Sequence, residues 1–280
     1  MRTILLFLLV SYLMFNSCCL FANIIDNTFE QHELGLYSKY KILLDWNGSD
    51  WIQGTNRMEI VEYPMRNKCL KISYPRDKFG SKESGGQWRF KLNKSYENLY
   101  LSFNVFFPKG FNFVKGGKLP GLAGGETKFA SSGNKPNGLN AWSARIMWRQ
   151  GGGLVQYVYH RDQPESYGED FKWNEYIVPG KWHFIENRVK LNDPGKKNGI
   201  LQAWLDGELV LDINRFYYRD NDSLSIDQFI FCTFFGGRDK TWSPDKYWYI
   251  YIDNIMISED RTDNVYLNPS VAPKQKHLKQ

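Results

Sequence analysis

The chain has 280 residues, enough for one large domain or two small ones, with 42% hydrophobic residues and a formal net charge of +6. No apolar run after residue 15 reaches the length of a membrane span, which excludes a membrane-spanning mature protein. The four cysteines and four histidines show no zinc-ligand spacing, so we expect neither a metal nor another cofactor.

The N-terminus has the pattern of a secretory signal peptide. A positive start at Arg2 precedes a twelve-residue apolar run over residues 4–15, which is too short for a membrane span. We expect cleavage after Ala22, so that residues 1–22 form the leader; cleavage near Cys18 or Cys19, with lipid attachment there, is the alternative. The mature protein is then secreted, extracellular or periplasmic, without membrane contact. It stays mildly basic, which for an exported protein suits an acidic polymer better than nucleic acid.

Strand patterns dominate the rest of the chain. Nine segments are rich in aromatic and β-branched residues, and most are bounded by Gly, Pro, Asn or Asp. In chain order they are CLKISYP, GQWRFKL, LYLSFNVFFP, AWSARIMWR, LVQYVYH, WHFIENRVKL, GILQAWLDGELVL, IDQFIFCTFF and YWYIYIDNIMI. Helical periodicity is limited to a turn or two over residues 24–34. We therefore predict a monomeric all-β protein, a two-sheet antiparallel sandwich or jelly roll over residues 23–265, followed by a basic, disordered tail over residues 266–280.

The segment FVKGGKLPGLAGG, residues 113–125, carries five glycines and Pro120 around Lys118. Glycine adopts backbone angles closed to other residues and lets a ligand approach the main chain, while proline stiffens the path. We expect a shaped loop that presents the charge of Lys118. An ordinary glycine-rich turn with a solvated lysine is the alternative.

Residues 141–160 predict an antiparallel hairpin, in which AWSARIMWR and LVQYVYH flank a QGGG loop. Strand alternation places Ser143 and Arg145 on one face of the first strand, and Tyr157 and Tyr159 on one face of the second. A register that pairs Arg145 with Tyr157 sets Ser143 opposite Tyr159, so that four polar side chains form one patch. His160 points to the opposite face, and we expect a structural histidine there.

This combination of side chains fits the β-elimination of a polyuronate. That reaction removes the weakly acidic proton at C5, beside the sugar carboxylate, and then expels the leaving group at O4. Arginine or lysine offsets the carboxylate charge while the carbanion-like state develops. Tyrosine serves as base or acid where neighbouring cations lower its pKa, and no metal is required.

Several motifs together resemble polysaccharide lyase family 14, the alginate lyases and related polyuronate lyases. They are GGKLPGLAGG, SARIMWR, YVYH, NDPGKKNGILQAWLDG and TFFGG, and the resemblance runs over residues 70–257. It implies a β-jelly roll whose concave sheet binds an acidic glycan. It also implies that Lys118 matches the essential lysine of the family. The matching strand-borne site residues are Ser143, Arg145, Tyr157 and Tyr159.

Within this site we expect Arg145 and Lys118 to neutralise the carboxylate, with Lys118 an alternative base. Tyr157 and Tyr159 are then the base and acid, and Ser143 positions one of them or the substrate. The expected activity is endolytic, metal-independent cleavage of an acidic polysaccharide. Mannuronate-rich alginate and glucuronan both remain open as the substrate.

Other residues are weaker candidates for the site. Gln87, Arg89 and Lys91 share one strand face and could form a second polar row along the substrate. Arg238 and Lys240 follow a glycine pair and could lie at the rim of the cleft. A solvated strand face explains the row of Gln87, Arg89 and Lys91 equally well. Cys69 and Cys232 lie in strand-like segments, and a disulfide between them is left open.

Two rival functions use the same fold. The first is a non-catalytic carbohydrate-binding jelly roll that recognises acidic glycans, which the 16% aromatic content would suit. The second is a retaining glycosidase, which needs two carboxylates about 5–5.5 Å apart. Its nearest candidates, Glu186 and Asp253, are unpaired in the sequence, so we do not favour it.

Overall fold

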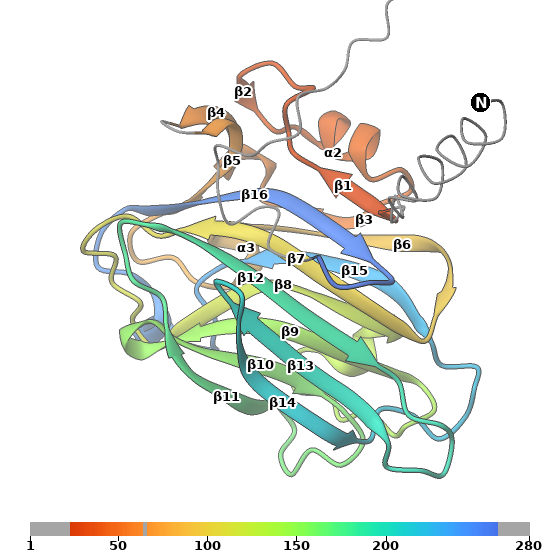
Figure 1. The fold of residues 1–280 in the computed structure, drawn as a ribbon. Helices are drawn as coiled ribbons and strands as arrows, with labels where there is room; N and C mark the ends of the chain where they lie inside the picture. Colours follow the sequence, from red (N-terminus) through yellow and green to blue (C-terminus); the bar gives the residue numbers. More distant parts are fainter. Residues whose placement is uncertain (1–22, 64–65, 263–280) are drawn as a thin grey trace, which may run out of the picture.

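The computed structural model of the protein describes residues 23–63 and 66–262 (Figure 1). The predicted leader over residues 1–22 and the predicted tail over residues 266–280 lie outside these residues. None of the helices in the described ranges is both long and apolar enough to cross a membrane.

Two antiparallel sheets form the two layers visible in Figure 1. The nine-stranded sheet has the order β14 (Glu208–Phe216), β13 (Gly199–Leu205), β12 (Trp182–Lys190), β7 (Asn98–Phe106), β16 (Trp248–Ser258), β5 (Arg66–Tyr74), β4 (Met58–Tyr63) and β2 (Gly35–Leu36), and β1 (Ile25–Asn27) also pairs with β16. The seven-stranded sheet has the order β11 (Glu169–Tyr176), β10 (Gly153–Tyr159), β9 (Ala141–Arg149), β8 (Gly116–Gly125), β15 (Ile226–Thr233), β6 (Gly86–Tyr96) and β3 (Asp50–Gln53). The predicted all-β sandwich is confirmed.

Helical segments are short and lie between strands. The α-helices are α2 (Lys39–Asp45) and α3 (Gly80–Glu83), and the 3-10 turns are η1 (Thr55–Arg57), η2 (Thr127–Ala130), η3 (Gln150–Gly152) and η4 (Lys240–Trp242). The helical turn expected over residues 24–34 is wrong, because that stretch contains β1. The helix begins later, after Ser38, whose side chain accepts a hydrogen bond from the Lys41 backbone N–H as an N-cap.

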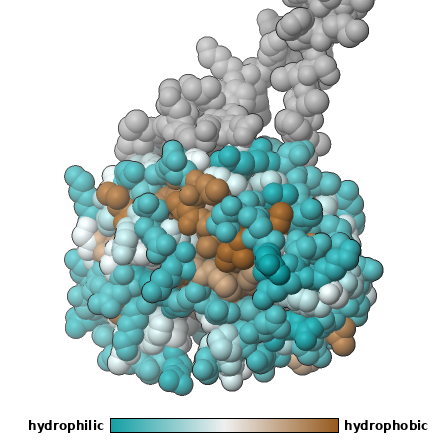
Figure 2. All heavy atoms as spheres, turned by 60° about the horizontal axis from the view of Figure 1, so that its bottom comes forward, coloured by the Kyte–Doolittle hydropathy of each residue, from teal (hydrophilic) through white to brown (hydrophobic). Residues whose placement is uncertain are grey.

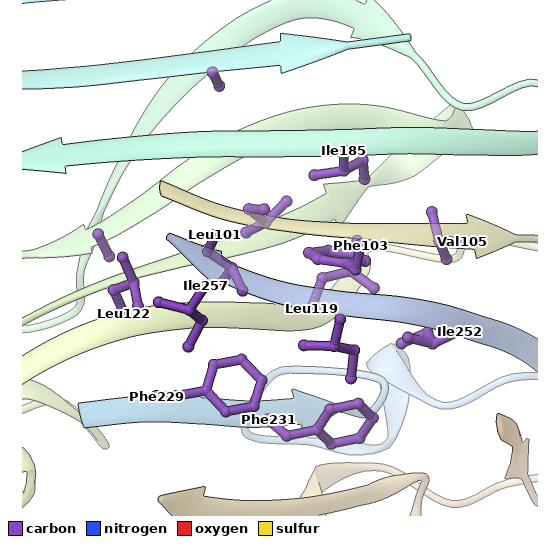
Figure 3. Packing of buried hydrophobic residues seen from close by; sticks show 14 of the residues in the cluster. Leu101, Phe103, Val105, Leu119, Leu122, Ile185, Phe229, Phe231, Ile252 and Ile257 are labelled. Atoms are coloured by element: carbon purple, nitrogen blue, oxygen red, sulfur yellow. The ribbon is translucent and has the colours of Figure 1, made fainter. Parts of the chain in front are cut away.

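Alternating apolar side chains of both sheets form the core between them (Figure 3). Leu101, Phe103 and Ile185 come from the nine-stranded sheet, and Phe229 and Phe231 come from β15 of the other sheet. On the face shown in Figure 2, hydrophilic side chains cover most of the surface and hydrophobic ones gather near its middle. Burial of the inward-facing side chains is the main stabilising contribution to the sandwich.

All nine predicted strand segments are strands in the structure, and GILQAWLDGELVL divides at Asp206 and Gly207 into the hairpin β13–β14. The glycine-rich segment around Lys118 is the exception. It was expected to be a loop, but residues 116–125 form β8, which is hydrogen-bonded to β9 on one side and β15 on the other. Glycine usually weakens a strand, whereas here its lack of a side chain permits close packing.

All five glycines in β8 lie where a side chain would not fit, and Gly117 and Gly121 are two examples. A Cβ atom at Gly117 would lie 2.0 Å from the Trp148 ring, and one at Gly121 would lie 2.2 Å from the Ala144 carbonyl oxygen. The register with β9 shifts between Leu119 and Gly121, so that Pro120, which has no N–H to donate, lies in a β-bulge.

The bulge in β8 also sets which side chains face the core. Leu119 and Leu122 both belong to the core although they are three positions apart, which a regular strand would not allow (Figure 3). Lys118, next to Leu119, therefore faces the opposite side of the sheet.

No disulfide joins the two cysteines of the described chain. Cys69 lies on β5 of the nine-stranded sheet, and Cys232 lies on β15 of the seven-stranded sheet. The disulfide that the sequence left open is therefore not formed, because the two cysteines lie on strands of different sheets.

Candidate active site

A cleft of about 810 Å³ runs over the solvent-facing side of the seven-stranded sheet. Its described lining includes residues of β3, β6, β8, β9 and β10, and Asp170 of β11. Five lysines and arginines line it against two aspartates, so the cleft is positively charged overall. A cleft of one sign concentrates ligands of the opposite sign, which here means anionic ones.

The hairpin β9–β10 has the predicted register. Arg145 pairs with Tyr157, and Ser143 pairs with Tyr159. On the other side of β9, Lys118 of β8 pairs with Met147. Lys118, Arg145, Tyr157 and Tyr159 therefore meet on three adjacent strands and all line the cleft.

Lys118 is the most buried amine of the cleft, with 8% of its surface exposed. Its Nζ donates a hydrogen bond to Met147 Sδ at 2.8 Å and lies 3.3 Å from the centre of the Tyr157 ring. Burial, reinforced by the charges of Arg145 and Arg149, lowers the pKa of Lys118 well below its usual value. A lowered pKa makes the amine easier to deprotonate, which favours the role of a base.

Arg145 is a buried cation without an acidic partner in the described part of the chain, and 5% of its surface is exposed. Its guanidinium carbon lies 5.7 Å from the ring centre of Tyr157 and 5.5 Å from that of Tyr159. The Nε atom is buried and makes no hydrogen bond to any described residue. A buried guanidinium with a free donor is suited to bind a carboxylate, because an uncompensated buried charge is costly.

The two tyrosine hydroxyls lie together beside these cations. Tyr157 Oη donates to Tyr159 Oη at 3.3 Å, and they accept hydrogen bonds from the backbone N–H groups of Gly168 and Gly133, respectively. Burial, followed by the neighbouring Tyr159, raises the pKa of Tyr157. A phenol that keeps its proton suits the role of an acid better than that of a base.

Ser143 is fully buried, and its hydroxyl donates to the Ala130 carbonyl of η2 at 2.8 Å. The segment after η2 contains Ser131 and Ser132, which line the cleft, and Gly133, which binds Tyr159. Ser143 thus holds the segment that positions Tyr159, instead of pointing its hydroxyl at the open cleft.

An ion pair that the sequence did not point to lies beside this group. Arg149 of β9 binds both carboxylate oxygens of Asp170 of β11, at 2.8 and 2.5 Å, and its guanidinium carbon lies 5.7 Å from the Tyr157 ring centre. Continuing the alternation from Ser143 through Arg145 would have placed Met147 and Arg149 on the same face. Asp170 lacked such a signal because β11 was not predicted.

The polar row predicted on β6 divides between two clefts. Gln87 lines the cleft of Lys118, whereas Arg89 and Lys91 line a second cleft of about 690 Å³. Arg89 forms an ion pair with Asp50, one hydrogen bond of which measures 2.7 Å from Nε to Oδ1. Arg89 is therefore already neutralised and is not free to bind a carboxylate of the substrate.

The two rim candidates are placed differently. Arg238 lines the cleft of Lys118. Lys240 begins η4 and points its Nζ at Asp77, 3.7 Å from Oδ1, and it is absent from the described lining of both clefts. Only Arg238 is therefore placed to contact a ligand in the first cleft.

The remaining titratable candidates lie outside the cleft. His160 binds Glu169 Oε2 at 2.8 Å, so it has a structural partner, as does another buried histidine, His183, which binds Asp206 Oδ2 at 2.9 Å. Glu186, named for the glycosidase alternative, lies on β12 of the other sheet and binds Arg261 at 2.9 Å. Within residues 23–63 and 66–262, no group of three or more His, Cys, Asp or Glu side chains could hold a metal ion.

The chain is similar to known proteins in sequence. The family model "Polysaccharide lyase 14" matches residues 63–255. A curated relative, exolysin of Paramecium bursaria Chlorella virus 1, is 28% identical over 196 residues, which is 60% of this chain. The chain spans only 30% of the length of that relative.

Solved structures share the fold. The marine alginate lyase of Aplysia kurodai is 24% identical with a TM-score of 0.73, covering 84% of this chain and 98% of its own. A mutant of the alginate lyase Aly36B in complex with alginate trisaccharide is 22% identical with a TM-score of 0.74, covering 85% of this chain and 98% of its own. At these identities the likeness concerns the fold.

Proposed function

This chain belongs to polysaccharide lyase family 14, and we propose that it cleaves an acidic polyuronate by β-elimination in the cleft around Lys118. The observation that carries the proposal is the meeting of two buried basic side chains, Lys118 with its lowered pKa and Arg145, with two tyrosine hydroxyls in one basic cleft. A binding module would need the charges but would gain nothing from a lysine whose pKa is lowered.

Each group has a role in the proposed reaction. Arg145 binds the carboxylate of the sugar whose C5–H bond breaks, which stabilises the charge that develops beside it. The neutral amine of Lys118 takes the C5 proton. The electron pair forms the C4–C5 double bond, the C4–O4 bond breaks, and a hydroxyl of the tyrosine pair donates the proton that O4 receives. Solvent then reprotonates the tyrosine, and Lys118 releases its proton.

The position of Lys118 supports endolytic cleavage. β8 is the central strand of the seven-stranded sheet, with three strands on either side. A chain lying across the strands would extend in both directions from the bond that breaks. We propose that the enzyme therefore cuts within chains.

Alginate is the first substrate to test, because two structural neighbours are named as alginate lyases, one of them in complex with an alginate trisaccharide. We propose mannuronate-rich alginate, with glucuronan as the competing polymer. We further propose that the protein acts as a monomer outside the cell after loss of residues 1–22, in line with the apolar run over residues 4–15.

The proposal is tested with a polysaccharide panel and the purified mature protein. The panel contains mannuronate-rich alginate, guluronate-rich alginate, glucuronan and a neutral glucan. The readout is the ultraviolet absorbance of the unsaturated product end, and product sizes during the first few per cent of cleavage report the mode. We expect absorbance to rise on one acidic polymer and long products to appear first.

A Lys118→Ala variant is the matched control. It should lose about 100- to 10,000-fold in kcat, the range of general base catalysis, while its melting temperature stays within a few degrees of the parent. Retardation of an acidic polymer in an affinity gel without any absorbance rise would favour the non-catalytic binding protein instead. Undiminished turnover in Lys118→Ala would refute the assignment of the base.

A further inference from the structure

An exposed tryptophan lies at one end of the cleft, far from the reacting groups. Trp51 is on β3, the edge strand of the seven-stranded sheet, and is 38% exposed. It lines the same cleft as Lys118. Among the described residues no aromatic ring packs against it. It also precedes the segment that the family model matches, which begins at residue 63.

The backbone holds Trp51 in an unusual conformation. Its φ is +55°, in the left-handed region that a bulky side chain rarely adopts. The register of β3 against β6 shifts between Asp50 and Gln53, so Trp51 lies in an irregular segment of the edge strand. Backbone strain of this kind is found preferentially at functional sites, where surrounding contacts maintain it.

Contacts on both sides of Trp51 maintain this conformation. Asp50 forms the ion pair with Arg89 of β6, and Gln53 accepts a hydrogen bond from Gln87 at 3.2 Å. Further along, Arg57 Nε donates to the Gly85 carbonyl at 2.8 Å. The segment is thus tied to β6 at two points, and to Gly85 just before β6 at a third, while the indole itself stays exposed. Tryptophan side chains are on average largely buried in folded proteins, so the exposure of Trp51 needs an explanation.

The distance to the reacting groups corresponds to a remote part of the substrate. β8 and β3 are separated by β15 and β6 in the sheet, which places them about 14 Å apart at the usual strand spacing. A glycan lying across the strands would reach Trp51 with a sugar that does not react. Gln87 of β6, the strand next to β3, lines the same cleft and supplies a hydrogen-bonding group, and Arg238 supplies a cation to its lining.

We propose that Trp51 is a stacking platform for a uronate residue remote from the bond that breaks, and that it makes the enzyme prefer long chains. One face of a sugar ring presents C–H groups, which pack against an indole, while its hydroxyl and carboxylate groups stay in solvent or meet Gln87 and Arg238. Binding energy from a remote contact raises the reactivity of long substrates over short ones. The proposal rests on the polyuronate lyase function for the chemistry of its ligand.

The test compares Trp51→Ala with the parent on a long polymer and on a trisaccharide of the same uronate. We expect kcat/KM on the polymer to fall about tenfold, equivalent to about 1.4 kcal/mol, mainly through KM. For a trisaccharide bound at the sites around Lys118, kcat/KM should change by less than about twofold. Trp51→Phe should recover most of the loss. Tyr40→Ala is the matched control, because Tyr40 is a 70% exposed aromatic on α2 outside both clefts.

Binding is measured separately, so that a failure of the lyase proposal does not obscure this one. In a Lys118→Ala background, affinity gels with the acidic polymer should show weaker retardation when Trp51 is also replaced. An unchanged polymer KM and unchanged retardation in Trp51→Ala would overturn the platform while leaving the lyase activity intact. Equal losses on polymer and trisaccharide would also overturn it, because they would place Trp51 at the reacting sugar.

Discussion

Lys118 owes its proposed chemistry to its surroundings more than to its own side chain. It is buried, its nearest hydrogen-bond acceptor is the thioether of Met147, and two arginines lie close enough to lower its pKa further. Asp170 acts in the opposite direction and raises the pKa. Because Asp170 and Arg149 form one ion pair, replacing each in turn tests the electrostatic account of the base.

The first prediction concerns the acid limb of the pH profile of kcat/KM. Lys118 is active as the neutral amine, so the rate rises with pH as the proton leaves. Arg149→Gln removes a cation that lowers the pKa, and the limb should move to higher pH. Asp170→Asn removes an anion that raises the pKa, and the limb should move to lower pH. The measurement is kcat/KM on the preferred polymer across the pH range in which the protein stays folded.

The opposite signs of these shifts separate charge from structure. Both variants break the same ion pair, so a purely structural loss would lower the rate or move the limb in the same direction in each. Shifts in one common direction, or no shift in either, would contradict the role of Lys118 as a base with a lowered pKa. Melting temperatures of the two variants serve as the control for folding.

At the scale of elements, the structure of the hairpin β9–β10 is predictable from its sequence, whereas that of strand β8 is not. Alternation in the hairpin is regular, so its faces and its register were predicted and are confirmed. β8 has five glycines, a proline and a bulge, and each of these weakens the signal of a strand. Its identity as the central strand depends on β9 and β15, which pack around it. Such contacts are not visible in local sequence.

The placement of residues at the ends of the site also depends on strand pairings that the local sequence does not show. One cleft brings together six of the predicted site residues, which are Lys118, Arg145, Tyr157, Tyr159, Gln87 and Arg238. Arg89 lies in another cleft, where Asp50 of β3 pairs with it. β3 itself joins the sheet through residues far from β6 in the chain, and nothing in its sequence indicates that pairing. Trp51 therefore could not have been placed from sequence patterns.

The second prediction tests the close packing of β8. Gly121→Ala places a Cβ atom 2.2 Å from the Ala144 carbonyl oxygen, and backbone has little freedom to move away. We expect a loss of about 2–3 kcal/mol of stability and a decrease in Tm of roughly 5–10 °C by circular dichroism. Gly153→Ala is the control, since its nearest neighbour would be a Tyr176 ring carbon at 3.4 Å. Equal Tm values for the two variants would show that β8 does not need its glycine.

At the scale of the whole molecule, the segment before residue 63 is part of the sandwich although the family model does not reach it. It supplies β3 to one sheet and β1, β2 and β4 to the other, as the red and orange strands of Figure 1 show. It also supplies Trp46, which is fully buried and stacks on Phe229 of β15 with ring centres 5.0 Å apart. Trp46 also packs on Trp88, at 5.8 Å.

The third prediction follows from this shared core. Trp46→Ala should reduce stability by about 3–5 kcal/mol, because it opens a cavity between α2 and the seven-stranded sheet. Unfolding should remain a single transition, so that circular dichroism and retention of an acidic polymer by the cleft are lost together as denaturant increases. Tyr40→Ala, on the exposed face of α2, should stay within about 0.5 kcal/mol of the parent. Two separate transitions in Trp46→Ala, with polymer binding by the cleft retained after the first, would instead show that the N-terminal segment unfolds independently of the rest of the sandwich. In that case the position of β3, and with it that of Trp51, would not be fixed by the stability of the sandwich.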